Sequence, residues 1–324
     1  MRKLLTLLVC AASALTLTAT AAATNGGLSP VAPVSPNGEK ANAAYWLIFA
    51  LSAVIFVVVE GALIVFVVRF RSRGRARTVD GPDIHGSTKL ETAWTIVPVV
   101  LLAAIATFVF VNLPGFTSPT KAQAAGAVNV DIVAHQFYWE FRYANGARSY
   151  DQLVAPAGKT VLLDITSEDV AHSWWIPAFG PKTDAIPGQT NHAWFRTSHL
   201  GTYRGQCSEL CGLLHAKMTQ TVKVLPQAAY DAWLQQQSAL SPAAMGAHEF
   251  EATCAKCHGP AAQGFIGPKI SDNPTTVDPA LLEELLHNGL RTMPAVGRGW
   301  TDGQIAALVA YFKSKPFTGG TSGQ

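Results

Sequence analysis

The chain of 324 residues is long enough for two domains of about 150 residues each. Only 14% of its residues are charged and 49% are hydrophobic, whereas roughly a quarter of a soluble domain is charged. This composition excludes a disordered protein and a nucleic-acid-binding protein, and it favours membrane segments. The net charge of +3 is too small to indicate a polyanionic partner.

The N-terminus has the pattern of a secretory signal peptide over residues 1–23. Two basic residues precede an apolar stretch, and small residues near its end provide a cleavage site. We therefore expect the mature chain to begin outside the cytoplasm, with residues 24–42 as an exported N-terminal segment.

Two apolar runs, residues 43–68 and 93–111, are each long enough to cross a lipid core of about 30 Å at 1.5 Å per residue. The loop between them, residues 69–92, is rich in arginine, so the positive-inside rule places it in the cytoplasm. The sequence thus predicts a two-pass protein of the bacterial cell (inner) membrane, in contact with lipid, whose remaining residues lie on the outer face.

Residues 126–225 form the first predicted exported domain. Short β-rich runs recur at 128–133, 160–165, 192–195 and 219–225, separated by turns rich in proline and glycine. Regular short strands with such turns indicate an all-β sandwich or barrel.

One loop of this domain carries a set of soft ligands for a metal ion. Two thiols, two imidazoles and a thioether are of the kinds that select copper, and they belong to Cys207, Cys211, His172, His215 and Met218. Two cysteines four residues apart can bridge two copper ions, which leaves one histidine per metal. Met218 and a carbonyl such as that of Glu209 would then be weak axial ligands.

Two other interpretations of this loop stay open on spacing alone. Cys207 and Cys211 could form a disulfide in an oxidising compartment. A zinc site is also compatible with cysteine and histidine, although methionine is a poor zinc ligand.

Three segments of the chain, residues 167–174, 182–188 and 207–218, resemble subunit II of haem-copper cytochrome c oxidases, and the similarity extends over roughly residues 40–225. The resemblance implies a cupredoxin barrel that holds a dinuclear CuA centre. Its ligands would be His172, Cys207, the Glu209 carbonyl, Cys211, His215 and Met218. The resemblance further implies that the Glu209 side chain helps to bind a magnesium ion shared with subunit I.

Two glutamates in the membrane region have roles suggested by position. The segment 90–98 is similar to the start of the second membrane helix in this family, which implies that Glu91 lies at the entrance of a proton pathway into subunit I. From the sequence alone, Glu91 is a first-turn carboxylate favoured by the helix dipole, and both roles are compatible. Glu60 lies inside the first span, where an ionisable group usually faces protein rather than lipid.

One position departs from the family pattern. The aromatic patch that receives electrons from soluble cytochrome c usually begins with tryptophan, and here that position is Phe137. The resemblance therefore leaves the route of electrons from a soluble donor open, with Tyr138 and Trp139 as nearby substitutes.

Residues 243–316 form the second predicted exported domain, joined to the first by a flexible linker over 226–242 and followed by a tail at 317–324. Helical periodicity appears at 243–257, 278–290 and 301–313. The motif of Cys254, Cys257 and His258 on an exported chain is the attachment signal for a c-type haem, with the histidine as proximal iron ligand. Thioredoxin-like chemistry would require a βαβ setting, which the sequence does not predict.

The sixth iron ligand follows by elimination among the methionines. Met1 is the initiator, Met218 belongs to the copper loop, and Met245 precedes the attachment site on the same helix, so Met293 is the candidate. The domain resembles small all-α class I cytochromes c. A subunit II with such a C-terminal fusion is the arrangement of caa3-type oxidases.

The sequence as a whole thus resembles subunit II of a proton-translocating aa3- or caa3-type cytochrome c oxidase. The resemblance implies covalent haem c, CuA and magnesium as cofactors, subunits I and III as partners, and a soluble or membrane cytochrome c or a quinol-cytochrome c reductase as donor. Oxygen reduction would lie in subunit I, because the two predicted spans contain no histidine. The alternative is a membrane-anchored copper and haem electron shuttle without an oxidase partner.

Overall fold

The computed structural model describes residues 29–71, 83 and 85–315 of the chain. The expected signal peptide and C-terminal tail lie outside these residues, as does much of the expected cytoplasmic loop. The described residues divide into two compact units, one formed by residues 39–116 and the other by the residues before 39 and after 116. Each unit is described by itself.

Two helices, α2 (Pro36–Arg69) and α3 (Thr88–Asn112), are long and apolar enough to cross a membrane, with mean hydropathies of 2.8 and 2.5 over their most apolar stretches. They contain the predicted spans and begin several residues earlier. Most of their side chains are exposed in the described chain, among them Phe110 and Glu60. Such an apolar exterior fits a lipid environment.

Glu91 lies in the first turn of α3. The backbone N–H of Ser87, the residue that precedes the helix, donates a hydrogen bond to the Glu91 Oε1 atom over 3.1 Å. This contact satisfies a backbone donor at the helix start, so the helix-start role predicted from the sequence is present in the structure.

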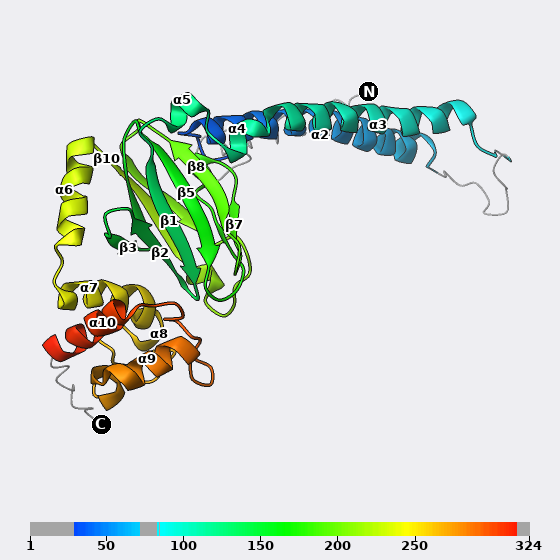
Figure 1. Ribbon diagram of the computed structural model, residues 1–324. Coiled ribbons are helices and arrows are strands. Elements are labelled where there is room, and N and C mark those ends of the chain that lie inside the picture. Colours follow the sequence, from blue (N-terminus) through cyan, green and yellow to red (C-terminus); the bar gives the residue numbers. More distant parts are fainter. Residues whose placement is uncertain (1–28, 72–82, 84, 316–324) are drawn as a thin grey trace, which may run out of the picture. The chain divides into compact units, whose positions relative to one another are not determined.

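The β domain consists of two main sheets and a small third one (Figure 1). The larger sheet has the strand order β3-β2-β1-β5-β8, the second has the order β4-β10-β9, and the third pairs β6 with β7. The strands are β1 (Val128–His135), β2 (Tyr138–Tyr143), β3 (Arg148–Tyr150), β4 (Gln152–Pro156), β5 (Thr160–Ser167), β6 (His172–Trp174), β7 (Thr183–Ala185), β8 (Asn191–Arg196), β9 (Gly201–Gln206) and β10 (Thr219–Leu225). Two short helices, α4 (Pro114–Thr117) and α5 (Lys121–Ala124), precede β1.

The core of this domain is formed by apolar side chains from both main sheets. Trp139, Phe141, Leu153, Leu163 and Val222 are completely shielded from solvent. β1 pairs antiparallel with β2 and parallel with β5, so the larger sheet is mixed. Successive side chains along a strand point to opposite faces of the sheet, and one face packs against the core. The predicted all-β, cupredoxin-like class is confirmed.

The segment predicted to be a flexible linker is a packed helix, α6 (Gln227–Ser238). Tyr230 is buried against the β domain, and the ring of Trp233 meets that of Tyr143 at a centroid distance of 5.0 Å. The prediction of flexibility was wrong because the alanine- and glutamine-rich sequence favours a helix, and its aromatic residues bury apolar area.

The C-terminal domain is helical, as predicted. It contains α7 (Pro242–Glu249), a π-helical segment (Phe250–Cys254), α8 (Ala255–His258), α9 (Pro279–Asn288) and α10 (Asp302–Ser314). Asp278 caps α9 by accepting from two backbone N–H groups, and Thr301 forms a capping box with Gln304 at the start of α10.

The first and last helices of this domain pack closely at Gly246. A Cβ atom at this position would lie 2.0 Å from the carbonyl oxygen of Ala307, so no larger residue fits. Next to this crossing, the rings of Phe250 and Tyr311 lie 5.3 Å apart between centroids.

Candidate functional site

The loop that carries the candidate copper ligands joins two paired strands. β9 and β10 are antiparallel neighbours, and Gln206 is paired with Thr219 at the point where the chain leaves and rejoins the sheet. The Cys207 N–H donates to the Met218 carbonyl over 2.9 Å, which closes the loop at its base. The Ser208 N–H donates to Ser173 O over 2.9 Å, so β6 with His172 is held beside the loop.

The structure brings all six predicted copper-ligating groups together. The sulfur atoms of Cys207 and Cys211 are 3.9 Å apart, with His172 Nδ1 3.8 Å from Cys207 Sγ and His215 Nδ1 3.6 Å from Cys211 Sγ. At opposite ends of this group, Met218 Sδ lies 3.8 Å from Cys211 Sγ and the carbonyl oxygen of Glu209 lies 3.2 Å from Cys207 Sγ. Each cysteine thus has its own histidine and its own weak ligand.

This set of donor atoms fits a pair of copper ions. Cys207, Cys211, His172 and Met218 are buried and His215 is half-buried, so soft ligands converge in a site that excludes most water. Both cysteines are free, and a sulfur separation of 3.9 Å is far beyond the bond length of about 2.05 Å of a disulfide. The disulfide interpretation is therefore not the arrangement found.

The protonation of the two cysteines is coupled. Hydrogen bonding between the two thiols lowers the pKa of Cys207 to about 3 and raises the pKa of Cys211. A metal ion would bind the thiolate form of both cysteines.

Asp169 is a functional residue that sequence reasoning missed. Its Oδ1 lies 2.8 Å from His172 Nε2, so the other ring nitrogen of His172 is directed at Cys207. Burial lowers the pKa of His172, but hydrogen bonds and charge interactions with Asp169 and Cys207 together outweigh burial, and the pKa is raised. A carboxylate behind a ligating histidine commonly orients the ring, and its position three residues before His172 was an available signal.

The Glu209 side chain is exposed, whereas its backbone carbonyl contacts Cys207. Its carboxylate lies 3.5 Å from Lys182 Nζ, and both side chains are about half exposed. An exposed pair of this kind contributes little to stability. The carboxylate is thus accessible to a cation, and the magnesium role remains a prediction.

The haem-attachment residues lie at the end of the first helical stretch of the C-terminal domain. Cys254 and His258 are buried, and Cys257 is partly buried. His258 Nδ1 lies 2.6 Å from the Pro268 carbonyl oxygen, which fixes the ring and leaves Nε2 for a ligand. A Cβ atom at Gly267 would lie 2.8 Å from the same ring, so glycine permits this approach. These residues fit a covalently attached haem.

Met293, the predicted sixth iron ligand, is partly buried. It packs against the core of the cytochrome domain, and its backbone exchanges hydrogen bonds with Leu290 that close a tight turn. Its ligand role remains a prediction.

The aromatic stretch that could receive a soluble donor is buried, partly in the β domain and partly against the chain's own C-terminal domain. Phe137, Tyr138 and Trp139 are all buried. The Tyr138 hydroxyl donates to the Val296 carbonyl over 2.8 Å and accepts from Trp300 Nε1 over 2.7 Å. Tyr138 thus lies against the cytochrome domain and Trp139 lies in the core of the β domain. Their part in electron entry remains a prediction.

Charged and polar groups also cross this interface, and sequence reasoning missed them. Glu140 is fully buried and forms ion pairs of 2.8 Å with Arg142 and Arg148, while Gln304 of α10 donates to it over 3.4 Å. Lys256, inside the haem-attachment motif, donates to Phe137 O and Asp151. No local sequence pattern predicts such contacts, because they depend on how the two domains dock.

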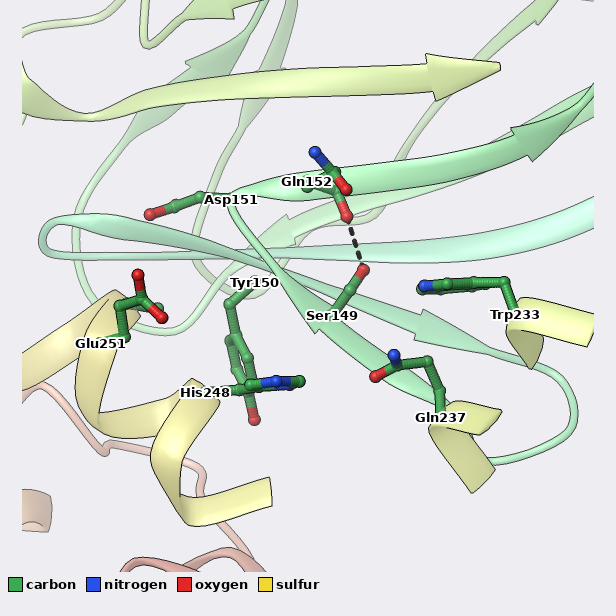
Figure 2. Close-up of a pocket in the computed structure, with 9 residues that line it drawn as sticks. Ser149, Tyr150, Asp151, Gln152, Trp233, Gln237, His248 and Glu251 are labelled. Carbon is green, nitrogen blue, oxygen red and sulfur yellow. Dashed lines mark hydrogen bonds between the residues drawn. The ribbon is translucent and has the colours of Figure 1, made fainter. Parts of the chain in front are cut away.

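A pocket of about 530 Å³ lies beside this interface. Figure 2 shows Tyr150 and Asp151 of the β domain facing His248 and Glu251 of the cytochrome domain, with Trp233 of α6 nearby. It contains none of the predicted metal ligands or haem-attachment residues.

Comparison with known proteins matches three family descriptions. Residues 23–111 match "Cytochrome C oxidase subunit II, transmembrane domain" and residues 147–225 match "Cytochrome C oxidase subunit II, periplasmic domain". Residues 241–312 match "Cytochrome C oxidase, cbb3-type, subunit III".

Similar proteins span most of the chain. Cytochrome c oxidase subunit 2 of Alkalihalophilus pseudofirmus is 30% identical over 314 residues, which cover 87% of this chain and 90% of that protein. The corresponding protein of Cereibacter sphaeroides is 32% identical over 286 residues, covering 73% and 93%. The solved periplasmic domain of subunit II of cytochrome oxidase (CoxB) of Bradyrhizobium japonicum has 30% identity and a TM-score of 0.34, over 34% of this chain and 93% of that chain.

These matches cover both membrane helices, residues 147–225 of the β domain and the helical domain. The protein is a two-pass membrane protein with its β domain on the periplasmic side. The chain therefore belongs to the cytochrome c oxidase subunit II family, with a cytochrome c domain fused at its C-terminus.

Proposed function

We propose that this subunit accepts electrons through a covalent haem c and a dinuclear CuA centre and delivers them to the oxygen-reducing site of subunit I, coupled to proton pumping. The observation that carries the proposal is the convergence of two thiols, two imidazoles, a thioether and a carbonyl, five of them from one loop and the His172 imidazole from β6. When bound, the haem and the copper pair would each accept and release one electron.

The chain's residues would hold these groups as follows. Cys207 and Cys211 would bridge the copper ions, His172 and His215 would each bind one of them, and the ligands Met218 and Glu209 O would complete the set. Asp169 orients His172, which keeps its Nδ1 directed at the metal position. A buried and rigid ligand set limits rearrangement when the charge of the site changes, which favours fast electron exchange.

In the cytochrome domain, Cys254 and Cys257 would form thioethers to the haem. His258 would bind the iron through Nε2, held by the Pro268 carbonyl, and Met293 would bind the opposite face. A histidine and methionine pair raises the potential of a haem, as an electron carrier requires.

The proposed partners follow from residues that need a second subunit. Glu209 has an accessible carboxylate for a magnesium ion shared with subunit I, and Glu91 lies at the start of α3 where a proton pathway would open. Subunit III and a cytochrome c or quinol-cytochrome c reductase donor complete the proposal.

Purification of the full-length chain from its native membrane tests the proposal. We expect subunit I to copurify with the chain, so that the preparation contains the haem of subunit I as well as the covalent haem c. The preparation should also take up oxygen when an electron donor is supplied. A chain that purifies alone, with copper and covalent haem but no oxygen uptake, would support the membrane-anchored shuttle instead.

A further inference from the structure

We propose that Lys256 and Gln136 are positioning residues that connect the haem-attachment motif to the copper loop through two hydrogen bonds, and that this connection sets the rate of electron transfer between them. The inference rests on the proposed function, because it assumes that both redox groups are present.

The first bond starts inside the haem-attachment motif. Lys256 lies between Cys254 and Cys257, and its Nζ donates to the carbonyl oxygen of Phe137 over 2.8 Å. The same ammonium group pairs with the carboxylate of Asp151, and the two side chains are only 20% and 26% exposed. Asp151 in turn accepts from the Trp139 N–H over 2.9 Å, so the lysine is held against the start of β2. This bond spans the two domains.

The second bond ends on a copper ligand. Gln136 directly precedes Phe137, and its Nε2 donates to the carbonyl oxygen of Cys211 over 2.6 Å. Its backbone N–H donates to Asp169, the carboxylate that orients His172. Gln136 thus contacts the ligand loop directly and the His172 ligand through Asp169.

The glycine after Cys211 permits this approach. A Cβ atom at Gly212 would lie 3.0 Å from Gln136 Nε2 and 3.2 Å from the Phe137 ring. Gly212 also has a φ of +127°, a backbone conformation that a larger residue rarely adopts. A bulkier residue would therefore separate the two segments.

The two bonds complete a short bonded route between the domains. The route passes from the haem-attachment motif through the Lys256 side chain to Phe137, through one peptide unit to Gln136, and through its side chain to Cys211. Apolar packing accompanies it, because Cys257 packs against the core of the β domain and Tyr138 belongs to the core cluster of the cytochrome domain.

Electron transfer falls off less steeply through covalent and hydrogen bonds than through gaps, so this route favours transfer. One electron would leave the haem iron, which is oxidised from ferrous to ferric, and would reduce the copper pair by one electron. No proton moves and no bond is broken.

The experiment uses the full-length chain loaded with haem and copper in detergent. A covalently tethered ruthenium photoreductant on the cytochrome domain reduces the haem in a flash, and haem reoxidation is followed optically. Substituting Lys256 by methionine should slow reoxidation about tenfold or more, because a lost hydrogen bond from a charged group corresponds to that factor in the docked population. Gln136→Leu removes a neutral hydrogen bond within the β domain and should slow reoxidation about threefold or more. Lys256→Arg should restore most of the rate, since arginine can donate to the same two acceptors.

A second readout needs no redox group. In the metal-free chain, Lys256→Met should increase amide hydrogen exchange at residues 137–139, whereas the control Lys313→Met, which removes an exposed lysine of α10, should change neither exchange nor rate. Unchanged transfer in both Lys256→Met and Gln136→Leu, with wild-type transfer intact, would overturn the proposal. Absence of any transfer in the wild type loaded with both groups would instead contradict the proposed function.

Discussion

The buried carboxyl group of Glu249 provides a test of how the cytochrome domain is held on the β domain. Its side chain is completely shielded from solvent where α7 faces β3. The Tyr150 hydroxyl donates to Oε1 over 3.2 Å, and Oε2 has no hydrogen-bond partner among the described residues. Burial, with a smaller contribution from the nearby charge of Glu140, raises the pKa of Glu249 to about 8.

The sign of the effect follows from proton linkage. A carboxyl whose pKa rises from 4.5 unfolded to about 8 folded binds its proton more tightly in the folded protein. Its contribution to the free energy of unfolding is fully present below about pH 4.5 and is lost as pH rises toward 8. Between pH 4.5 and 7 the loss is about 3 kcal/mol, since one pKa unit corresponds to about 1.4 kcal/mol.

We therefore expect Glu249→Gln, which cannot ionise, to flatten the pH dependence of stability and to be more stable than wild type near pH 8. The measurement is urea unfolding of the full-length chain in detergent, followed by tryptophan fluorescence at pH 5, 6.5 and 8. An unchanged slope of stability against pH in this range would refute the reasoning.

Glu140→Gln is the matched control. Burial raises the pKa of Glu140, but the neighbouring His135 and the hydrogen bond from Arg142 together outweigh burial and lower the pKa to about 2. The stabilising contribution of Glu140 is therefore present above about pH 4.5 and is lost only as pH falls toward 2. The control should lose about 3 kcal/mol at neutral pH, because Arg142 and Arg148 lose their buried partner. It should keep most of the wild-type slope between pH 5 and 8, because burial contributes more than the charge of Glu140 to the raised pKa of Glu249.

Three further predictions concern the redox groups and the donor. Met293→Ala should leave the haem attached but lower its reduction potential, as measured by redox titration, whereas Met245→Ala should not. Glu91→Gln should slow turnover of the assembled oxidase without changing the metal spectra, and unaltered turnover at all pH values would leave only the helix-start role. Deleting residues 243–324 should sharply reduce oxidation of soluble cytochrome c while copper stays bound, and Phe137→Trp in the truncated chain should recover part of it. Full activity of the truncated chain would show that the cytochrome domain does not receive the electrons.

The elements of this fold could largely be predicted because their signals are local. The strand β10 and the helix α10 follow from the period of their apolar residues, and the caps at Asp278 and Thr301 from side chains that bond nearby backbone. The candidate copper ligands were recognisable because five of the six lie within one loop. The pairing of β9 with β10 brings the two ends of this loop together, and with them the ligands that the loop carries.

The contacts between the two domains could not be predicted in this way. Gln136 and Lys256 are 120 positions apart and are joined only through the Phe137 carbonyl, which depends on how the folded domains dock. The helix α6 was not predicted because the prolines and serines that flank it are typical of a linker, whereas its interior favours a helix. The absence of tryptophan at Phe137 is consistent with a covered surface, since no soluble partner needs to dock there.

Metal content and electron paramagnetic resonance of the purified full-length chain test the central claim most directly. The account predicts two copper ions and one covalent haem per chain, with one unpaired electron shared by both copper nuclei in the oxidised state. Cys211→Ser should abolish the shared signal and leave the haem in place, because the serine oxygen cannot replace the bridging sulfur. A wild-type chain with a single copper, or a Cys211→Ser chain that keeps the shared signal, would contradict it.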